Sequence, residues 1–348
     1  MDRCDAIKLI LWNHAFNAVV LTTWLGYMIA ANRWSIYAEG WPVALVMMAA
    51  GFIAGSTPMG GGVIAYPILV LALGNTPLEF RTFSLMMQSI GMTSASWRIL
   101  RSFKDHLNAL LLTTGFVLSF IGYNLGYYWV TPNLSGPMVQ TVYFTKMFFL
   151  TVLMHAYIDY VNPAERSTDL SLRARQLAVF VPVVLVGGIA TSMTGTGSDI
   201  WTYLYYRLFF NTEEILTTNH TVIIMSATSL FAMFNAFVIQ TNDVSAKLVN
   251  HALCSVPSVL LTAPVGAFVV NRWFKYSPWW KGYIYLLESS QMVAGFALTI
   301  SKSWQTIAAS VGMLAVGVSS LFGRYMLVDR ARKNTERKES ISRDETEL

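Results

Sequence analysis

Long apolar stretches separated by short polar loops run along almost the whole chain. A stretch of roughly 17–25 mostly apolar residues is long enough to cross the hydrocarbon core of a bilayer as a helix. We expect such spans, in chain order, at 7–31, 41–57, 80–100, 107–130, 137–161, 176–193, 214–240, 250–273, 282–300 and 305–328. The pattern therefore predicts an all-α polytopic membrane protein.

Two of these apolar stretches are interrupted by a glycine-rich run and then resume. The first break contains Pro58 and ends on a glycine triplet at 60–62, and the second contains Gly195 and Gly197. Proline removes a backbone donor and glycine lowers helix stability, so neither helix can continue smoothly. In a bilayer, broken backbone survives only where protein or a water-filled cavity satisfies its polar groups. Each break therefore predicts either a buried kink or a binding site.

The two broken stretches align with each other without a gap. Gly51 falls on Gly187 and Ser56 on Ser192, an offset of 136 residues, and an Asn-Thr turn and a more polar span follow each break. The arm that resumes after each break is too short to cross the membrane, because about 12 residues at 1.5 Å each reach roughly 18 Å. We therefore expect each break to form a re-entrant hairpin, within a sequence that contains two repeats.

The positions of Lys and Arg predict how the repeats are oriented. Four cation clusters lie at 98–104, 166–175, 272–281 and 324–333, and the remaining loops hold few cations. All four can be cytoplasmic only if each broken stretch makes an even number of crossings. Three full crossings then separate the hairpins, so the second opens opposite to the first, as in the inverted-topology repeats of secondary transporters.

This arrangement gives a complete domain prediction. A single transmembrane transporter domain is expected over 1–328, with both termini in the cytoplasm. Within it, repeat one covers about 41–161 and repeat two about 176–301, with extra spans at the N- and C-terminal ends. A charged, solvated cytoplasmic tail follows at 329–348.

Composition agrees with a membrane protein and excludes several classes of function. Hydrophobic residues make up 54% of the 348 residues and charged residues 12%, which is about half the charged share of a soluble domain. The cations lie in loops and in the tail, so the basic balance does not indicate nucleic-acid binding. The sequence shows no His-x-x-x-His, Cys-x-x-Cys, paired-acid or nucleotide phosphate-binding motif. We therefore expect no enzyme, no cofactor, no metal site and no ATP-driven transport within this chain.

The motifs around the first break resemble the TauE/SafE sulfite exporter family. The resemblance rests on the glycine triplet at 60–62, the Tyr-Pro pair at 66–67, the Arg-Thr-Phe-Ser run at 81–84 and the basic loop at 97–104. The second copy departs from the pattern, because Thr-Gly-Thr-Gly-Ser-Asp at 194–199 replaces the triplet. The resemblance covers about 41–300. It implies a protein of the cell membrane, the inner membrane if bacterial, that exports or imports sulfur-containing anions such as sulfite and organosulfonates.

The tips of the two breaks are the main candidates for a binding site. Free backbone N–H groups and the positive end of the helix dipole face each break where its short arm begins, which suits an anion. Close helix packing through small residues is the alternative explanation of the same glycines. The substrate-binding candidates are the small or polar residues of both tips and of the spans that follow: Ser56, Thr57, Gly60, Gly61, Gly62, Ser84, Gln88, Ser192, Thr194, Gly195, Thr196, Gly197, Ser198 and Asn219.

Three ionisable residues are candidates for proton coupling. Asp199 either caps the second short arm, carries protons or belongs to a cation site. His220 either shuttles a proton or is a satisfied interior histidine. Glu288 either carries protons or pairs with a polar neighbour. All three interrupt apolar sequence, where ionisable groups are costly and usually functional.

Three basic residues within or near the spans need separate explanations. Arg81 and Arg207 could attract anions, but we expect both side chains to extend along the apolar surface to the membrane interface. Lys146 lies about ten residues into its span and is the least expected of the three. An anion-attracting role is one explanation of Lys146, and its function stays open.

Together these patterns predict a secondary transporter of small anions that works by alternating access. Sulfite or an organosulfur anion is the expected substrate, and proton coupling is a hypothesis. The expected partners are the anion, the lipid bilayer and, as an open alternative, a second copy of the chain in a homodimer. A passive anion channel on the same fold, or more remotely a membrane-embedded redox protein, would also fit the spans. Flux measurements in proteoliposomes distinguish the secondary transporter from the passive channel.

Overall fold

The computed structural model describes residues 3–56, 61–158, 174–239 and 244–269, and in these ranges the regular elements are helices. The long helices are α1 (Arg3–Ala30), α2 (Tyr37–Ser56), α4 (Pro77–Ser102), α5 (Ala109–Leu125), α6 (Gly136–Ile158), α7 (Ala174–Thr194), α8 (Ser198–Phe209), α9 (Glu214–Phe234) and α10 (Ala246–Val269). The shorter elements are η1 (Trp34–Ile36), α3 (Gly62–Tyr66), η2 (Pro67–Ala72), η3 (Lys104–His106), η4 (Gly126–Val130), η5 (Thr131–Asn133) and η7 (Asn235–Ile239).

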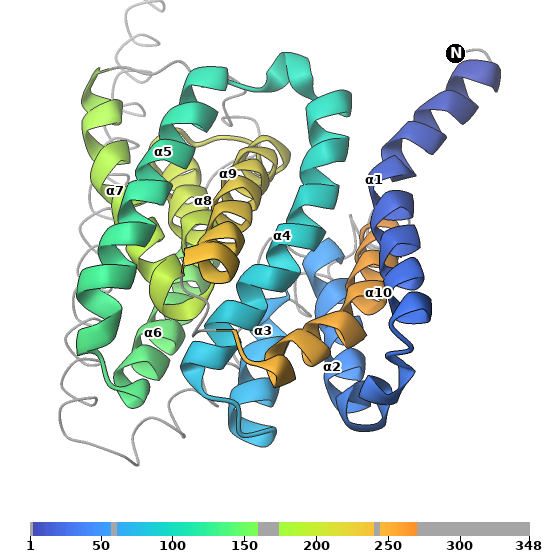
Figure 1. Ribbon diagram of the computed structural model, residues 1–348. Helices are drawn as coiled ribbons and strands as arrows, with labels where there is room; N and C mark the ends of the chain where they lie inside the picture. The colour runs from blue at the N-terminus through green and yellow to red at the C-terminus, as the bar shows by residue number, and fades with distance from the viewer. Residues whose placement is uncertain (1–2, 57–60, 159–173, 240–243, 270–348) are drawn as a thin grey trace, which may run out of the picture.

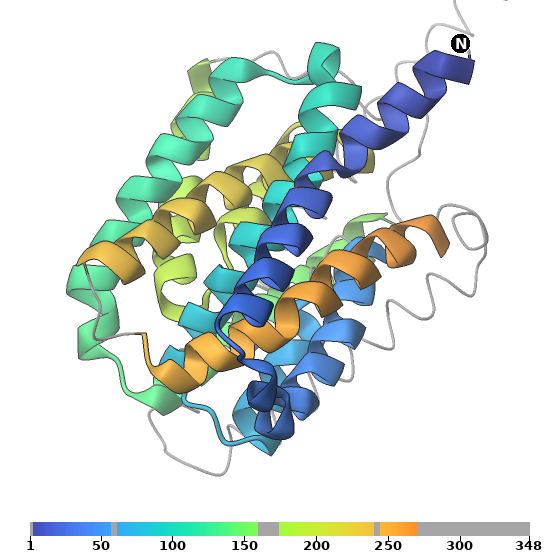
Figure 2. The same ribbon diagram turned by 45° about the vertical axis from the view of Figure 1, so that its right-hand side comes forward.

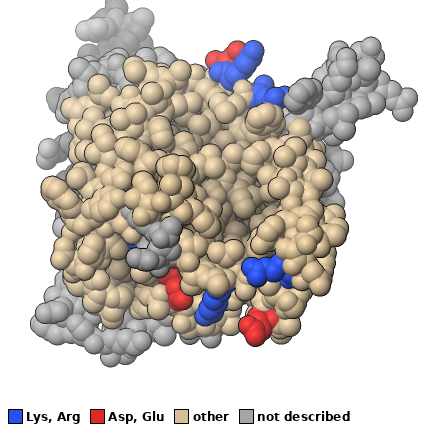
Figure 3. Space-filling view, viewed as in Figure 1, with Lys and Arg blue, Asp and Glu red and all other residues tan. Residues whose placement is uncertain are grey.

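Within the described residues, five helical segments are long and apolar enough to cross a membrane, as expected of a polytopic helical membrane protein. They are Trp34–Gly55, Ala109–Asn133, Leu177–Thr194, Ile215–Ile239 and Ala246–Gly266. Helix α4 is long enough as well, with 26 residues, but it carries Glu79 and three arginines and is not one of the five. In Figure 3 the charged side chains gather towards the upper edge and the lower third of the visible face, and a broad uncharged band separates them.

Helices α4 and α9 cross in the middle of the molecule, and two tightly packed helix pairs lie on either side (Figures 1 and 2). Helix α2 packs along α10, and α5 packs along α7. Glycine makes both contacts possible. A Cβ on Gly55 would lie 1.8 Å from the Ala263 carbonyl oxygen, and one on Gly122 would lie 2.2 Å from the Leu185 carbonyl oxygen. Small residues bring helix backbones close together in this way in membranes.

The helices of the two predicted repeats begin at matching places. Helix α3 starts at Gly62 and α8 at Ser198, the offset of 136 residues read from the sequence. The first residues of α4 and α9 are separated by this same offset to within one residue, and so are the first residues of α5 and α10. Each tight pair takes one helix from each repeat, and α4 contacts α10 as α9 contacts α5. The inverted orientation of the repeats, and the re-entry of each hairpin on one side, stay predictions.

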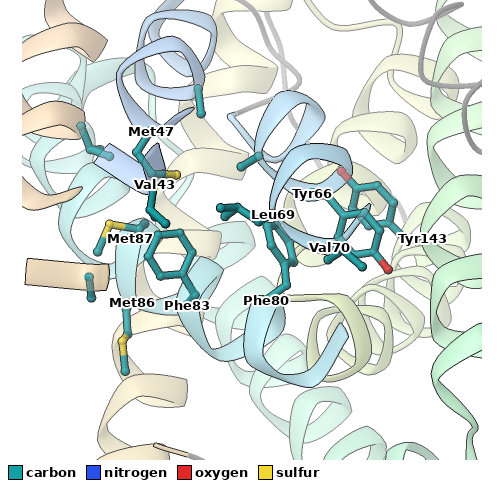
Figure 4. Close-up of a cluster of buried hydrophobic side chains, with 14 of the residues drawn as sticks. Val43, Met47, Tyr66, Leu69, Val70, Phe80, Phe83, Met86, Met87 and Tyr143 are labelled. Atoms are coloured by element: carbon teal, nitrogen blue, oxygen red, sulfur yellow. The ribbon is translucent and has the colours of Figure 1, made fainter. Parts of the chain in front are cut away.

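A hydrophobic core fills the space between α2, η2, α4, α6 and α10 (Figure 4). At one end of it, the rings of Tyr66 and Tyr143 are stacked, with centroids 3.7 Å apart and planes inclined by 10°. The edge of Phe80 meets the Tyr66 ring at 4.7 Å. Such aromatic contacts add to the energy of burial. This stack connects α4 and α6 to the arm that follows the first break.

Several predictions fall outside the described residues. They are the spans at 282–300 and 305–328, the tail at 329–348, and the site candidates Thr57, Gly60 and Glu288. The end of repeat two, as far as 301, lies there as well. These predictions stand as they were made from the sequence.

Candidate functional site

The second break is a three-residue turn that is pressed against α4. Helix α7 ends at Thr194, and α8 begins at Ser198. Between them, Gly195 has a φ of +75°, a left-handed conformation that only glycine adopts readily. A Cβ at this position would lie 2.8 Å from both the Arg81 carbonyl oxygen and the Ser84 Cβ. The backbone conformation and the close approach both require glycine.

A buried lysine from α6 holds this turn. Lys146 is only 4% exposed, and its Nζ donates to Thr194 Oγ1 and to the Thr196 carbonyl oxygen, both at 2.5 Å. The same Nζ donates to the Thr196 hydroxyl and lies 4.9 Å from the centroid of the Tyr143 ring. An ammonium has three hydrogens to donate. All of its oxygen partners here belong to the second break.

Asp199 occupies the first turn of α8, next to the same turn. Its side chain is partly buried, and its Oδ1 accepts a hydrogen bond of 2.9 Å from the Gly197 amide. This contact satisfies an amide at the start of the helix, which is the capping role that the sequence offered as one explanation. The carboxylate also interacts electrostatically with the Lys146 ammonium. Asp199 therefore both caps α8 and balances a buried charge.

On the opposite side of the turn, α4 contributes an amide and a hydroxyl. Gln88 Nε2 donates to Ser84 Oγ and to the Gly195 carbonyl oxygen, each at 2.8 Å. Ser84 is 6% exposed and Gln88 is partly buried. Consecutive carbonyls of the turn, Gly195 and Thr196, thus receive hydrogen bonds from two different helices. This arrangement brings together Ser84, Gln88, Thr194, Gly195 and Thr196, which the sequence had predicted as one group.

A chain of fully buried hydroxyls fixes the start of α8. Ser198 Oγ bonds to Thr191 Oγ1 at 2.9 Å and to Ser119 Oγ, which also accepts from Thr228 Oγ1 at 3.0 Å. The Ser198 amide donates to Thr191 Oγ1 at 2.8 Å. All four side chains are inaccessible to solvent. Ser198 therefore joins α8 directly to α5 and α7, and Ser119 extends the chain to α9, so that every hydroxyl in it has a partner.

The first break reaches the second one through α6. The Tyr143 hydroxyl donates to the Gly62 carbonyl oxygen at 2.8 Å, one helical turn before Lys146. A Cβ on Gly62 would lie 3.6 Å from Thr196 Cγ2, so the two breaks face each other across a space of about one methyl group. Gly61 sits against α2, where a Cβ would lie 2.5 Å from the Ala50 carbonyl oxygen. Ser56 is the last residue of α2, and nothing is described of its side chain.

Two predicted residues lie on α9, and one of them is far from the breaks. His220 Nε2 accepts from the Asn108 amide at 3.0 Å, and its Nδ1 is 2.9 Å from the Leu216 carbonyl oxygen. Asn108 precedes α5, about 16 Å along that helix from Ser119 at 1.5 Å per residue. His220 therefore connects the start of α5, through Nε2, to the preceding turn of its own helix α9, through Nδ1. Asn219, 8% exposed, is its neighbour in sequence.

The prediction that the side chains of Arg81 and Arg207 extend to the membrane interface is wrong. Arg81 and Arg207 are each 2% exposed and do not extend to the membrane interface. The Arg81 Nη1 donates to the Ser192 carbonyl oxygen at 3.3 Å, and the Arg207 guanidinium donates to the Thr212 carbonyl oxygen. Ser192 is in the last turn of α7, where carbonyls lack helical partners and cations are favourable. Backbone carbonyls outside regular helical pairing, at the end of α7 for Arg81 and in the loop after α8 for Arg207, therefore keep both guanidinium groups inside the protein.

The site is a polar cluster in which cations and hydroxyls outnumber acids. Lys146 is its main unpredicted member, since the sequence left the role of this residue open. Within the described ranges, no group of three His, Cys, Asp or Glu side chains could hold a metal ion. An ammonium, an amide and several hydroxyls around a backbone turn are suited to a small oxyanion.

Comparison with known proteins gives one match. The model of the family described as sulfite exporter TauE/SafE matches residues 43–287, well over half of the chain and inclusive of both breaks. Neither the comparison with curated proteins nor the comparison with solved structures found a match.

Proposed function

The chain belongs to the TauE/SafE sulfite exporter family, and on this basis we propose that it is a secondary transporter of sulfite or an organosulfur anion. The family is one of membrane transporters of sulfite or related anions, which agrees with five apolar helices and with a role other than catalysis. One observation carries the proposal: on α6, the buried Lys146 bonds to the second break at Thr194 and Thr196, one helical turn from the Tyr143 hydroxyl that bonds to the first break at Gly62.

The anion is proposed to bind where Lys146 meets the second break. A negative oxygen accepts hydrogen bonds from an ammonium more strongly than a neutral hydroxyl does. The Lys146 ammonium can therefore exchange threonine oxygens for oxygens of the anion. Burial strengthens this attraction, because the effective dielectric constant inside a protein is lower than in water. The hydroxyls of Thr194 and Thr196 would then donate to the anion as well.

Transport is proposed to proceed by alternating access between two inverted repeats. The matched starts of α3 and α8, and of α4 and α9, support two equivalent halves. The crossed pairs α2 with α10 and α5 with α7 support movement as two rigid bodies around the central site. Inverted-repeat transporters place their substrates between such halves, at discontinuous helices. The cell membrane is the proposed location.

The proposal is tested by uptake of labelled sulfite, sulfate, thiosulfate and 2-aminoethanesulfonate into proteoliposomes that contain the purified protein. A secondary transporter saturates with substrate and responds to an imposed pH gradient. A passive channel dissipates the anion gradient without saturation or coupling. Protein-free liposomes give the background. Movement of a cation in the absence of any anion flux would contradict the proposal.

Proton coupling is proposed to depend on Asp199. Its carboxylate shares the surroundings of Lys146, so a negative charge there opposes an entering anion and a proton there favours it. Replacing Asp199 with Asn mimics the protonated form. We expect the Asp199→Asn variant to bind sulfite at least as tightly as the wild type and to lose most of the pH dependence of uptake. An unchanged pH profile in this variant would leave Asp199 with its capping role alone.

A further inference from the structure

Helix α10 contains a backbone carbonyl that its own helix cannot satisfy. In an α-helix, the carbonyl of Leu253 would accept a hydrogen bond from the amide of the residue four positions further on, which is Pro257. Proline has no N–H to donate, so this hydrogen bond is missing. An unmet carbonyl in the interior of a membrane protein is unfavourable. The Leu253 carbonyl therefore needs a donor from another element.

Helix α1 supplies this donor. Trp24 Nε1 donates to the Leu253 carbonyl oxygen at 2.8 Å. The Trp24 ring is partly buried, packs against the hydrophobic core and meets the ring of Trp34 edge to face, with centroids 6.1 Å apart. An indole has a single N–H, and in Trp24 it fills the position that the proline leaves open. Helix α1 is thus bonded to α10 at the proline.

The same side of α1 is bonded to α4. Asn17 lies seven residues before Trp24, about two turns back on the same face of the helix. Its Oδ1 accepts a hydrogen bond from Ser94 Oγ, and both of these side chains are 8% exposed. Figure 2 shows α1 running across α4 and α10. Helix α1 therefore connects a helix of repeat one to a helix of repeat two.

Helices α4 and α10 also touch each other close to the proline. A Cβ on Gly91 of α4 would lie 3.1 Å from Val259 Cγ1, two residues beyond Pro257. Helix α1 itself lies outside the matched part of the chain, since it ends at Ala30 and the family model begins at residue 43. Within the described residues, no hydrogen bond joins α1 to either break. Helix α1 is therefore placed to affect the movement of helices rather than the recognition of the anion.

We propose that α1 is a brace that ties α4 to α10 in the described conformation and thereby limits the rate of transport. The inference rests on the proposed function, because alternating access moves the two repeats relative to each other. A single rigid helix cannot follow both α4 and α10 when they shift, so the bond from Asn17 or the bond from Trp24 must break. Both bonds stabilise the starting conformation and raise the barrier for leaving it. Their loss should speed turnover and leave the binding of the anion unchanged.

Two single substitutions each release one end of the brace. Trp24→Phe keeps an aromatic ring without the N–H, and Asn17→Leu keeps the size of the side chain without the acceptor. We expect each variant to raise kcat for sulfite uptake into proteoliposomes about threefold, the effect of one average hydrogen bond between membrane helices. KM should stay within about twofold of the wild type, because no contact with the substrate is removed.

Trp34→Phe is the matched control. It makes the same substitution in the ring that touches Trp24, and Trp34 is 44% exposed. We expect kcat for sulfite uptake to be unchanged in this variant. An equal gain in Trp34→Phe and Trp24→Phe would attribute the effect to ring packing and would overturn the inference.

The double variant Asn17→Leu/Trp24→Phe distinguishes a brace from two separate contacts. The two bonds act in series, so breaking either one already releases α4 from α10. The double variant should therefore be no faster than the faster single variant. The losses of thermal stability should instead add, because the two residues are about 10 Å apart along α1 and share no bonding partner.

Each outcome separates this inference from the proposed function. An unchanged or lower kcat in either single variant would overturn the inference and leave anion transport standing. Gains that multiply in the double variant would show two independent contacts and would also overturn it. If the wild-type protein moves neither sulfite nor any other labelled anion, the proposed function fails, and the inference fails with it.

Discussion

The two breaks interrupt their helices at equivalent positions but are held by different kinds of contact. The second break is surrounded by polar side chains from four helices, including Lys146 on α6, Gln88 on α4 and Ser119 on α5. In its described residues, 61 and 62, the first break combines a close backbone approach with a hydrogen bond from one side chain. Gly61 lies against a carbonyl of α2, and the carbonyl of Gly62 accepts from Tyr143.

Alignment of the repeats shows where the difference arises. At the offset of 136 residues, Ser198 falls on Gly62 and Asp199 on Val63. The second copy thus carries a hydroxyl and a carboxylate where the first has a glycine and an apolar side chain. We infer that the two breaks have divided their tasks. The first permits close approach of the halves, and the second provides the chemistry that recognises the substrate. Four predictions test this division.

Loss of the Lys146 charge should have the largest effect. We expect Lys146→Met to lower sulfite uptake by about a hundredfold, because each hydrogen bond of a charged group contributes about 1.5–3 kcal/mol. Lys146→Arg keeps the charge, but a planar guanidinium cannot direct its donors to one point, so a partial loss is expected. Lys247→Met is the control, since Lys247 is exposed on α10 and bonds only to the Asn75 side chain in the described region. Equal uptake by both methionine variants would remove Lys146 from the site.

A methyl group should destabilise the protein when it is added at the second break but not when it is added at the first. Gly195→Ala places a Cβ 2.8 Å from the Arg81 carbonyl oxygen on a left-handed backbone, and the backbone conformation alone costs about 1–2 kcal/mol. Gly62→Ala meets its nearest atom at 3.6 Å, an ordinary contact. We expect Gly195→Ala to lower the thermal unfolding temperature in detergent by several degrees and Gly62→Ala to leave it nearly unchanged. The reverse order would refute the contrast between the breaks.

Removal of the Ser198 hydroxyl should have a smaller effect on stability. Ser198→Ala leaves Ser119 and Thr191 without one of their partners, and Thr191 keeps its bond to the Gly187 carbonyl. Hydrogen bonds between membrane helices contribute about 0.6 kcal/mol on average, so a loss of about 1 kcal/mol is expected from two contacts. Chemical unfolding in mixed micelles measures it. A double-mutant cycle with Thr228→Ala should show coupling, since the two residues share Ser119.

The smallest effect is expected at the first break. Tyr143→Phe removes the hydroxyl that donates to the Gly62 carbonyl and leaves the stack on Tyr66 intact. The loss should be about 0.5–1 kcal/mol of unfolding free energy, the usual net value of a neutral hydrogen bond. Uptake of sulfite should stay within about threefold of the wild type. A larger loss of uptake than in the Lys146 variants would assign substrate recognition to the first break instead.

Features with a local cause could be predicted from the sequence. The second break was readable because glycines and polar residues interrupt an apolar run. The apolar stretches predicted spans from 80 and from 214, and α4 and α9 begin at Pro77 and Glu214. The capping role of Asp199 was one of the alternatives, since the first turn of a helix favours an acid.

Contacts between distant segments could not be predicted. The partners of Lys146 lie 48 and 50 residues further along the chain, and one lysine within an apolar helix carries no periodic signal of its partner. The arginines were misplaced because extension to the interface is the usual behaviour of isolated arginines. Here backbone carbonyls outside regular helical pairing lie inside the protein. The two backbone partners of His220 could not be read from the sequence either, because one of them, Asn108, lies 112 residues away.

The packing of α2 on α10 also has a consequence for biosynthesis. The Tyr37 hydroxyl donates to the Cys254 carbonyl oxygen, 217 residues further along the chain. At about 5–20 residues per second, the ribosome needs roughly 10–40 seconds to produce that partner. During this interval, the side of α2 that packs on α10 is in the membrane without its partner helix. The packing of α2 on α10 therefore cannot form until translation has reached α10.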